Sequence, residues 1–194
     1  MKAANIEHLQ IGSFETTRDV LIVSDPCYKL GTWCMGQVSD AKPGLWNASI
    51  GVADMGEWGR RIAYLAAFHH EAPDIKTLKL NEAKFEVGVD SGQAGIFDFD
   101  HYQDQSVIPD QSLSEFGDPW YTHCCHQTLN TEHHAGVIPF GVVASSGFGD
   151  GAYICRYYTS QSEHTPITWG VVIDFELVRM SQIMKKLCER QFGR

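Results

Sequence analysis

Short runs of aromatic and β-branched residues recur along the chain, and glycine, proline and aspartate separate them. The runs show no 3.6-residue period, and the breaks between the first four contain Asp-Pro, Lys-Pro-Gly and Met-Gly-Glu-Trp-Gly. Apolar segments of this length between such breaks predict β-strands joined by turns. The predicted strands are residues 20–25, 31–38, 45–53, 60–70, 85–89, 94–99, 136–146, 152–160 and 167–175.

Two of the breaks have the composition of tight turns. Residues 90–93 read Asp-Ser-Gly-Gln, and residues 147–151 read Gly-Phe-Gly-Asp-Gly; each lies between two predicted strands. Asp and Gly supply hairpin turn chemistry, and glycine tolerates positive φ. A strand follows the second break, whereas a phosphate-binding loop needs a helix N-terminus there. Both breaks therefore predict β-hairpins.

Two segments show helical spacing instead. Apolar residues recur every four positions in residues 114–130, where Pro119 suits a first turn. Residues 176–192 carry an apolar stripe that predicts an amphipathic helix docked on the sheet, and Gly193 is placed to end it. The stripe consists of Leu177, Met180, Met184, Leu187 and Cys188.

The length of 194 residues suits one globular domain, residues 1–194, that buries a core without disulfides. Many strands and two helices predict an α+β fold that is mainly β. We expect an antiparallel sheet or sandwich of short strands, with one mid-chain helix and one C-terminal helix packed on it. Six cysteines at irregular intervals without a Cys-x-x-Cys pair favour free, mostly buried thiols over a disulfide framework.

The chain is acidic, with 15 basic and 24 acidic residues and a net charge of −9. Nucleic-acid binding needs a basic stripe, and the chain has only short basic pairs, so no nucleic-acid partner is expected. The same charge disfavours anionic membrane surfaces. The sequence shows no signal-peptide pattern and no apolar run of membrane-spanning length, so a cytoplasmic location is expected.

Several side chains are candidates for chemistry. Asp90, Asp98 and Asp150 would hold a divalent metal if the turns meet, with solvated acidic turns as the alternative. His123 and His126 share the polar face of the predicted helix, so a zinc site is the alternative to surface histidines. No other cofactor is indicated. The five tryptophans are most simply core anchors, and one or two of them are candidates to line a ligand cleft.

Four segments, in this order, resemble the bacterial domain-of-unknown-function 4241 family: SDPCY, VGVDSGQAGIFD, GVVASSGFGDGAYICRYY and VVIDF. The resemblance covers about residues 20–175 and implies a β-rich single domain. Relatives in bacterial toxin-immunity neighbourhoods imply a binding role. The chain departs from the family pattern in the Cys-Tyr after its first Asp-Pro, in a histidine-rich insert and in an added C-terminal helix. The motif residues carried over are Asp25, Asp90, Gly92, Asp98, Gly147, Gly149, Asp150, Gly151 and Tyr153.

These patterns favour a soluble, β-rich binding or interaction domain of unknown ligand, with an immunity-like role implied by the resemblance. Negative charge where the two turns meet would suit a cationic partner. The residues expected to bind the ligand are Asp25, Asp90, Ser91, Asp98, Asp150 and Tyr153.

Two enzymatic alternatives remain open at this point. In the first, Asp90, Asp98 and Asp150 hold a divalent ion in a metal-dependent hydrolase, and His123 or His126 carries a proton. In the second, the chemistry is that of a thiol. Cys27 follows an Asp-Pro turn that exposes it, although the sequence shows no base beside it.

Overall fold

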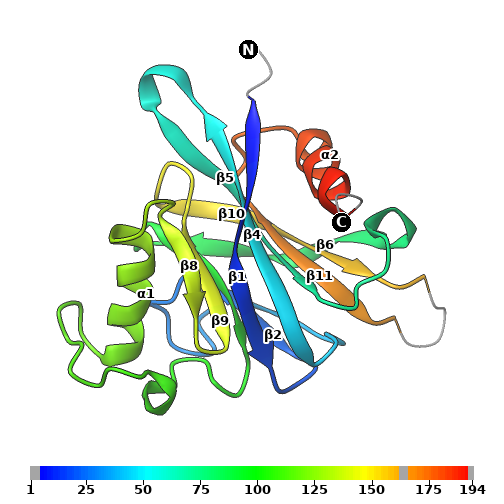
Figure 1. Ribbon diagram of the computed structural model, residues 1–194. Coiled ribbons are helices and arrows are strands. Elements are labelled where there is room, and N and C mark those ends of the chain that lie inside the picture. The colour runs from blue at the N-terminus through cyan, green and yellow to red at the C-terminus, as the bar shows by residue number, and fades with distance from the viewer. Residues whose placement is uncertain (1–4, 162–165, 192–194) are drawn as a thin grey trace.

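The protein is a two-layer β-sandwich with one helix on the outer face of each layer, as Figure 1 shows for a computed structural model that describes residues 5–161 and 166–191. The predicted α+β, mainly β class is confirmed. The strands are β1 (Ile6–Thr16), β2 (Leu21–Ser24), β3 (Gly36–Val38), β4 (Gly44–Asp54), β5 (Arg60–His69), β6 (Lys79–Val89), β7 (Gln93–Asp98), β8 (Ala135–Ile138), β9 (Gly141–Ser145), β10 (Gly151–Thr159) and β11 (Thr168–Asp174). The helices are α1 (Pro119–Leu129) and α2 (Met180–Gln191), and three 3-10 turns are η1 (Gly56–Trp58), η2 (Ile75–Thr77) and η3 (Gln105–Val107).

The strands form two antiparallel sheets that enclose the main core. The six-stranded sheet has the order β1-β4-β5-β11-β10-β6, and the five-stranded sheet has the order β3-β2-β7-β9-β8. Successive side chains of a strand point to opposite faces, so one strand serves two cores. In β2, Leu21 and Val23 face the core between the sheets, whereas Ile22 faces the α1 side.

Each helix covers one outer sheet face. Helix α1 packs Trp120 and Cys124 against the five-stranded sheet. Helix α2 packs Ile183 and Leu187 against the six-stranded sheet, as the apolar stripe predicts. The two helices lie on opposite sides of the sandwich in Figure 1. Burying both faces of the central strands explains why those strands read as continuous apolar runs.

The two predicted hairpins are wrong in their pairing. β6 pairs with β10 in one sheet, and β7 pairs with β2 and β9 in the other, so the turn between β6 and β7 crosses from sheet to sheet. The turn between β9 and β10 makes the same crossing. Turn chemistry allows the chain to reverse but does not decide which strand it meets afterwards. All six residues of β7 are buried, which requires a central place in a covered sheet.

Other differences concern strands with weak apolar signals. β1 and the first half of β6 were not predicted, because both are edge strands in which polar and charged side chains alternate with buried ones. Residues 31–35 form turns and not the start of a strand. Residues 136–146 form two strands, β8 and β9, because the chain reverses at Phe140, whose φ is 60°.

The helices and cysteines follow the predictions more closely. Asp118 caps α1, since its carboxylate accepts a hydrogen bond of 2.9 Å from the N–H of Tyr121, and Pro119 occupies the first turn. Helix α2 begins at Met180, four residues later than predicted, and the predicted stop at Gly193 lies outside the described residues. Within the described ranges, neither helix is long and apolar enough to cross a membrane. All six cysteines are free thiols.

Candidate functional site

The two glycine-bearing turns lie side by side. Val89 pairs with Gly151 in one sheet, and Gln93 pairs with Ser145 in the other, so both connections cross between the sheets at the same end of the sandwich. The N–H of Ser146 donates a hydrogen bond of 3.0 Å to the carbonyl of Gly92. The expectation that these distant segments meet therefore holds for their backbones.

Asp25 ties a third segment to this junction. Its side chain is fully buried and accepts hydrogen bonds from the N–H groups of Asp90 (2.9 Å) and Ser91 (2.7 Å). It also accepts from the Ser91 hydroxyl (2.6 Å) and from the N–H of Cys27 (2.9 Å). These four bonds satisfy a carboxylate that would otherwise be buried without a partner. We therefore interpret Asp25 as a clamp between two turns, and Ser91 as its partner.

The clamp also affects the thiol of Cys27. The pKa of Cys27 is raised to about 12, mainly by burial and to a smaller extent by the hydrogen bond and negative charge of Asp25 and the charge of Asp90. A thiolate is the reactive form of cysteine, so this thiol is a poor nucleophile at neutral pH although the residue is exposed. The environment of Cys27 therefore disfavours thiol chemistry.

Asp98 lies at the far end of β7 from the turn junction, about 17 Å along the strand from Gln93. Its buried carboxylate accepts hydrogen bonds from Thr17, through both N–H and hydroxyl, and from the N–H of Arg18 and Nδ1 of His101 (2.7 Å). Burial by itself raises the pKa of this carboxyl, but the hydrogen bonds from His101, Thr17 and Arg18 outweigh it and hold the pKa below 3.8. Asp98 thus holds the loop after β1, which contains Thr17 and Arg18, and the loop after β7, which contains His101, against the end of β7.

The proposed metal ligands do not come together. Asp90 and Asp150 are exposed beside the turn junction, whereas Asp98 lies at the opposite end of β7. On helix α1, His126 bonds to Glu115 at 2.5 Å, and burial lowers the pKa of His123. In the described part of the chain, no group of three or more His, Cys, Asp or Glu side chains is placed to hold a metal ion. The predicted metal site of Asp90, Asp98 and Asp150 is therefore not formed, because these side chains lie apart.

Tyr153 supports the glycine-rich turn from inside. Its hydroxyl lies 2.6 Å from the carbonyl of Gly149 and 3.1 Å from that of Ser146, and its ring packs edge-on against Phe175. The side chain is buried, and burial raises its pKa, so the hydroxyl remains a donor at neutral pH. In this structure Tyr153 shapes the turn from within the fold, and its hydroxyl faces carbonyls of the same chain.

A cavity of about 510 Å³ adjoins the two turns and is called here the turn-junction cavity. Its lining contains two arginines and two histidines but one glutamate, and the exposed Asp90 and Asp150 of the two turns are not among the lining residues. Arg60 pairs with Glu7, but among the described residues no carboxylate forms an ion pair with Arg61. The lining residues are Val52, Arg60, Arg61, Ile62, Gly92, Glu132, His133, His134, Ser145, Ser146, Gly147 and Gly149.

An exposed aromatic pair flanks this cavity. Trp58 is 69% exposed and Phe148 is 55% exposed, and their ring centroids lie 6.0 Å apart at 75°. Trp58 precedes Arg60 by two residues, and Phe148 lies between two lining glycines. The two rings belong to loops far apart in the sequence, and together they expose an apolar surface of a kind that is usually buried.

Sequence reasoning did not select Trp58, Phe148 or Arg61 for this site. A usable signal was present, because both aromatic residues lie in glycine-rich connections between strands, outside the strands and α-helices that direct side chains into a core. The fully buried Trp46 and Trp120, in contrast, are the core anchors that sequence reasoning expects. Trp33, 92% exposed, lies in a different loop.

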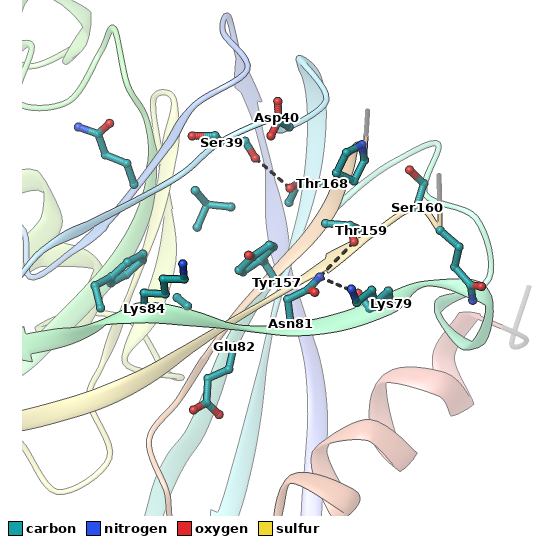
Figure 2. A pocket seen from close by; sticks show the side chains of 16 residues that line it. Ser39, Asp40, Lys79, Asn81, Glu82, Lys84, Tyr157, Thr159, Ser160 and Thr168 are labelled. Atoms are coloured by element: carbon teal, nitrogen blue, oxygen red, sulfur yellow. Dashed lines mark hydrogen bonds between the residues drawn. The ribbon is translucent and has the colours of Figure 1, made fainter. Parts of the chain in front are cut away.

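A second hollow, larger than the turn-junction cavity, lies elsewhere, between the edges of the two sheets (Figure 2). It has a volume of about 920 Å³ and is called here the inter-sheet groove. Sequence reasoning missed it, because its lining comes from unrelated segments of β3, β6 and β10. The residues include Ser39, Asp40, Lys79, Asn81, Lys84, Tyr157, Thr159 and Thr168.

Comparison with protein-family models, curated proteins and solved structures finds no match, so both hollows are interpreted from their own geometry.

Proposed function

We propose that this chain is a non-enzymatic interaction domain that captures an anionic group of its partner in the turn-junction cavity. The observation that carries the proposal is Arg61, which lines the cavity without an ion-pair partner among the described residues. Nη1 of Arg61 donates a hydrogen bond of 3.0 Å to the carbonyl of Arg60, and the remaining donors of its planar guanidinium suit a carboxylate or a phosphate. The immunity-like role implied by the family resemblance is a special case of this function.

The aromatic pair supplies the apolar part of the interface. Trp and Arg are the residues most enriched among the side chains that dominate binding energy, and both occur here within a few positions. Trp58 is 69% exposed, so covering its free surface would contribute about 3 kcal/mol. The Arg61 and Trp58 contacts are complementary, since one fixes the orientation of the partner and the other supplies affinity.

The backbone around the cavity is held before a partner arrives. Asp25 clamps the turn that contains Gly92, and Tyr153 holds the turn that contains Gly149. A surface that is already ordered loses less conformational entropy on binding. This gives the buried motif residues an indirect part in recognition.

The test uses phenyl phosphate and benzoate as probes and benzyl alcohol as their uncharged analogue, with binding measured by calorimetry. We expect the anions to bind and the alcohol not to bind. Arg61→Gln should weaken anion binding at least about tenfold, the loss of one charge-assisted contact. The matched control is Arg18→Gln, which removes an equal charge at the other end of β7 and should leave binding unchanged. Equal losses in both variants, or a wild type that ignores both anions, would contradict the proposal.

A further inference from the structure

The inter-sheet groove opens beside a free sheet edge. β6 is the last strand of the six-stranded sheet. One edge of β6 pairs with β10, and no described strand of the sheet pairs with its other edge. On the other side, the described backbone makes one hydrogen bond, from the N–H of Gly88 to the carbonyl of Cys34 at 2.8 Å. The edge between Lys79 and Glu86 therefore presents backbone groups that another strand can pair with.

Cationic side chains line the groove on the β6 side. Figure 2 shows Lys84 and Asn81 projecting from β6 into the groove, while Glu82 projects away from it. Glu82 pairs with Arg156 at 3.2 Å, so it does not neutralise the groove. Lys79 also lines the groove, and no described carboxylate forms an ion pair with either lysine. Asp40, on the loop after β3, is the acidic residue across from them.

The floor of the groove is ordered and polar. The side-chain amide of Asn81 donates to the carbonyl of Lys79 (3.2 Å) and to the hydroxyl of Thr159 (3.1 Å), as Figure 2 shows. The hydroxyl of Thr168 donates to the carbonyl of Ser39 at 2.9 Å. Tyr157 lies at the centre, and no described residue forms a hydrogen bond with its hydroxyl. The floor thus leaves polar groups available to an incoming side chain.

We infer that the inter-sheet groove binds an extended acidic peptide segment of a partner protein, which adds a strand to the free edge of β6. In such a complex the two backbones pair, and every second side chain of the peptide points to one face. Those side chains enter the groove, where carboxylates meet Lys79 and Lys84. The pairable edge from Lys79 to Glu86 spans about 23 Å, which matches a peptide of about seven residues.

The charged side chains of β6 have an alternative explanation. Lysine and glutamate on an edge strand discourage that edge from pairing with the sheet of another molecule. The register shift opposite Ile154 and Arg156 bends β6 and adds to that protection. Protection alone predicts that no strand pairs with β6, whatever its charge. The groove beside the edge predicts instead that a strand of matching charge pairs, so the two interpretations differ in a measurable way.

The probe is a fluorescein-labelled peptide of alternating composition, Thr-Glu-Val-Glu-Val-Glu-Thr, measured by fluorescence anisotropy. We expect saturable binding to the wild type and at least about tenfold weaker binding of the same peptide with lysine in place of glutamate. Lys84→Glu should reverse this preference. Arg61→Gln should leave it unchanged, so failure of this inference and failure of the proposed function are distinguishable.

Backbone pairing has its own test. The N–H of Gly88 points away from β10, so the N–H of Glu86, two residues earlier in the strand, points the same way. Glu86→Pro removes that donor and should abolish peptide binding while circular dichroism shows a folded protein. A second test, independent of that variant, is N-methylation of every second peptide bond in the probe, either at the odd or at the even positions. One of these two methylated peptides should not bind, because its methyl groups replace the N–H groups that pair with β6.

Three results would overturn the inference. The first is no saturable binding of either peptide up to about 1 mM. The second is equal binding of the methylated and unmethylated probes, which would remove backbone pairing. The third is a dimer in solution that Glu86→Pro dissociates, since a second copy of the chain would then be the occupant of the edge.

Discussion

Replacing Asp25 with alanine is expected to destabilise the fold by about 3–4 kcal/mol. The carboxylate accepts four hydrogen bonds, and bonds to a charged group contribute about 1.5–3 kcal/mol each. Their sum is not lost in full, because Cys27 and Asp90 lie at exposed positions where water replaces the missing acceptor. What remains is the cost of leaving the other, part-buried donors of the network without an acceptor, about 1–3 kcal/mol for each of them.

The assay is urea unfolding followed by tryptophan fluorescence. A domain with a stability of about 5–15 kcal/mol remains folded after such a loss, so both variant and wild type give complete transitions. Ser91→Ala removes one of the four bonds and should lower stability by about 1 kcal/mol. Asp150→Ala removes an exposed aspartate of the neighbouring turn and should change stability by less than about 0.5 kcal/mol. If Asp25→Ala is as stable as Asp150→Ala, the clamp does not exist.

Further outcomes follow from the same structure. Because the pKa of Cys27 is raised to about 12, iodoacetamide should label it more slowly than free cysteine at neutral pH, as followed by mass spectrometry; labelling as fast as free cysteine would refute the assigned environment. The pKa of Asp98 is lowered from 3.8, so its contribution to stability is present above that pH and is lost as pH falls through the folded-state pKa; acid unfolding of Asp98→Asn should lack this component. Gly95→Ala would place a methyl carbon 2.6 Å from a backbone carbonyl and should destabilise by about 1–3 kcal/mol in urea, whereas Gly151→Ala, with its nearest atom at 3.5 Å, should be nearly neutral.

Much of the fold could be read from local patterns. Six strands, β2, β4, β5, β7, β10 and β11, were predicted close to their observed places. Their side chains are buried on at least one face, and the alternation or continuity of apolar residues indicates that burial. Helix α1 was predicted from its spacing and from Pro119, and α2 from its stripe. The edge strands β1 and β6 were harder, since edges expose polar side chains and resemble loops in sequence.

The candidate site was predictable only in part. The two glycine-bearing turns were expected to meet, and their backbones do meet through the 3.0 Å hydrogen bond from Ser146 to Gly92. The hydrogen bonds between Asp25 and Ser91 were not predicted, although both residues were expected to bind the ligand. Their expected role as ligand-binding groups had a weaker basis, because a motif shows that a residue is required but not whether it faces solvent or the interior. No local sequence pattern predicts the surfaces that contain Arg61, Trp58 and Lys84. Each of these surfaces is assembled from segments that lie far apart in the chain.

By itself, the sequence determined the class of fold and the approximate places of most strands and both helices, since each follows from the burial of neighbouring residues along the chain. The irregular spacing of the cysteines indicated free thiols. Only the tertiary structure decided which strands pair, that both turns cross between sheets, and that Asp25 and Asp98 face inward at opposite ends of β7. The physical reason is that pairing and hollows depend on contacts between residues far apart in the chain. Those contacts are selected by how whole faces pack, and a turn that satisfies local chemistry is compatible with several of them.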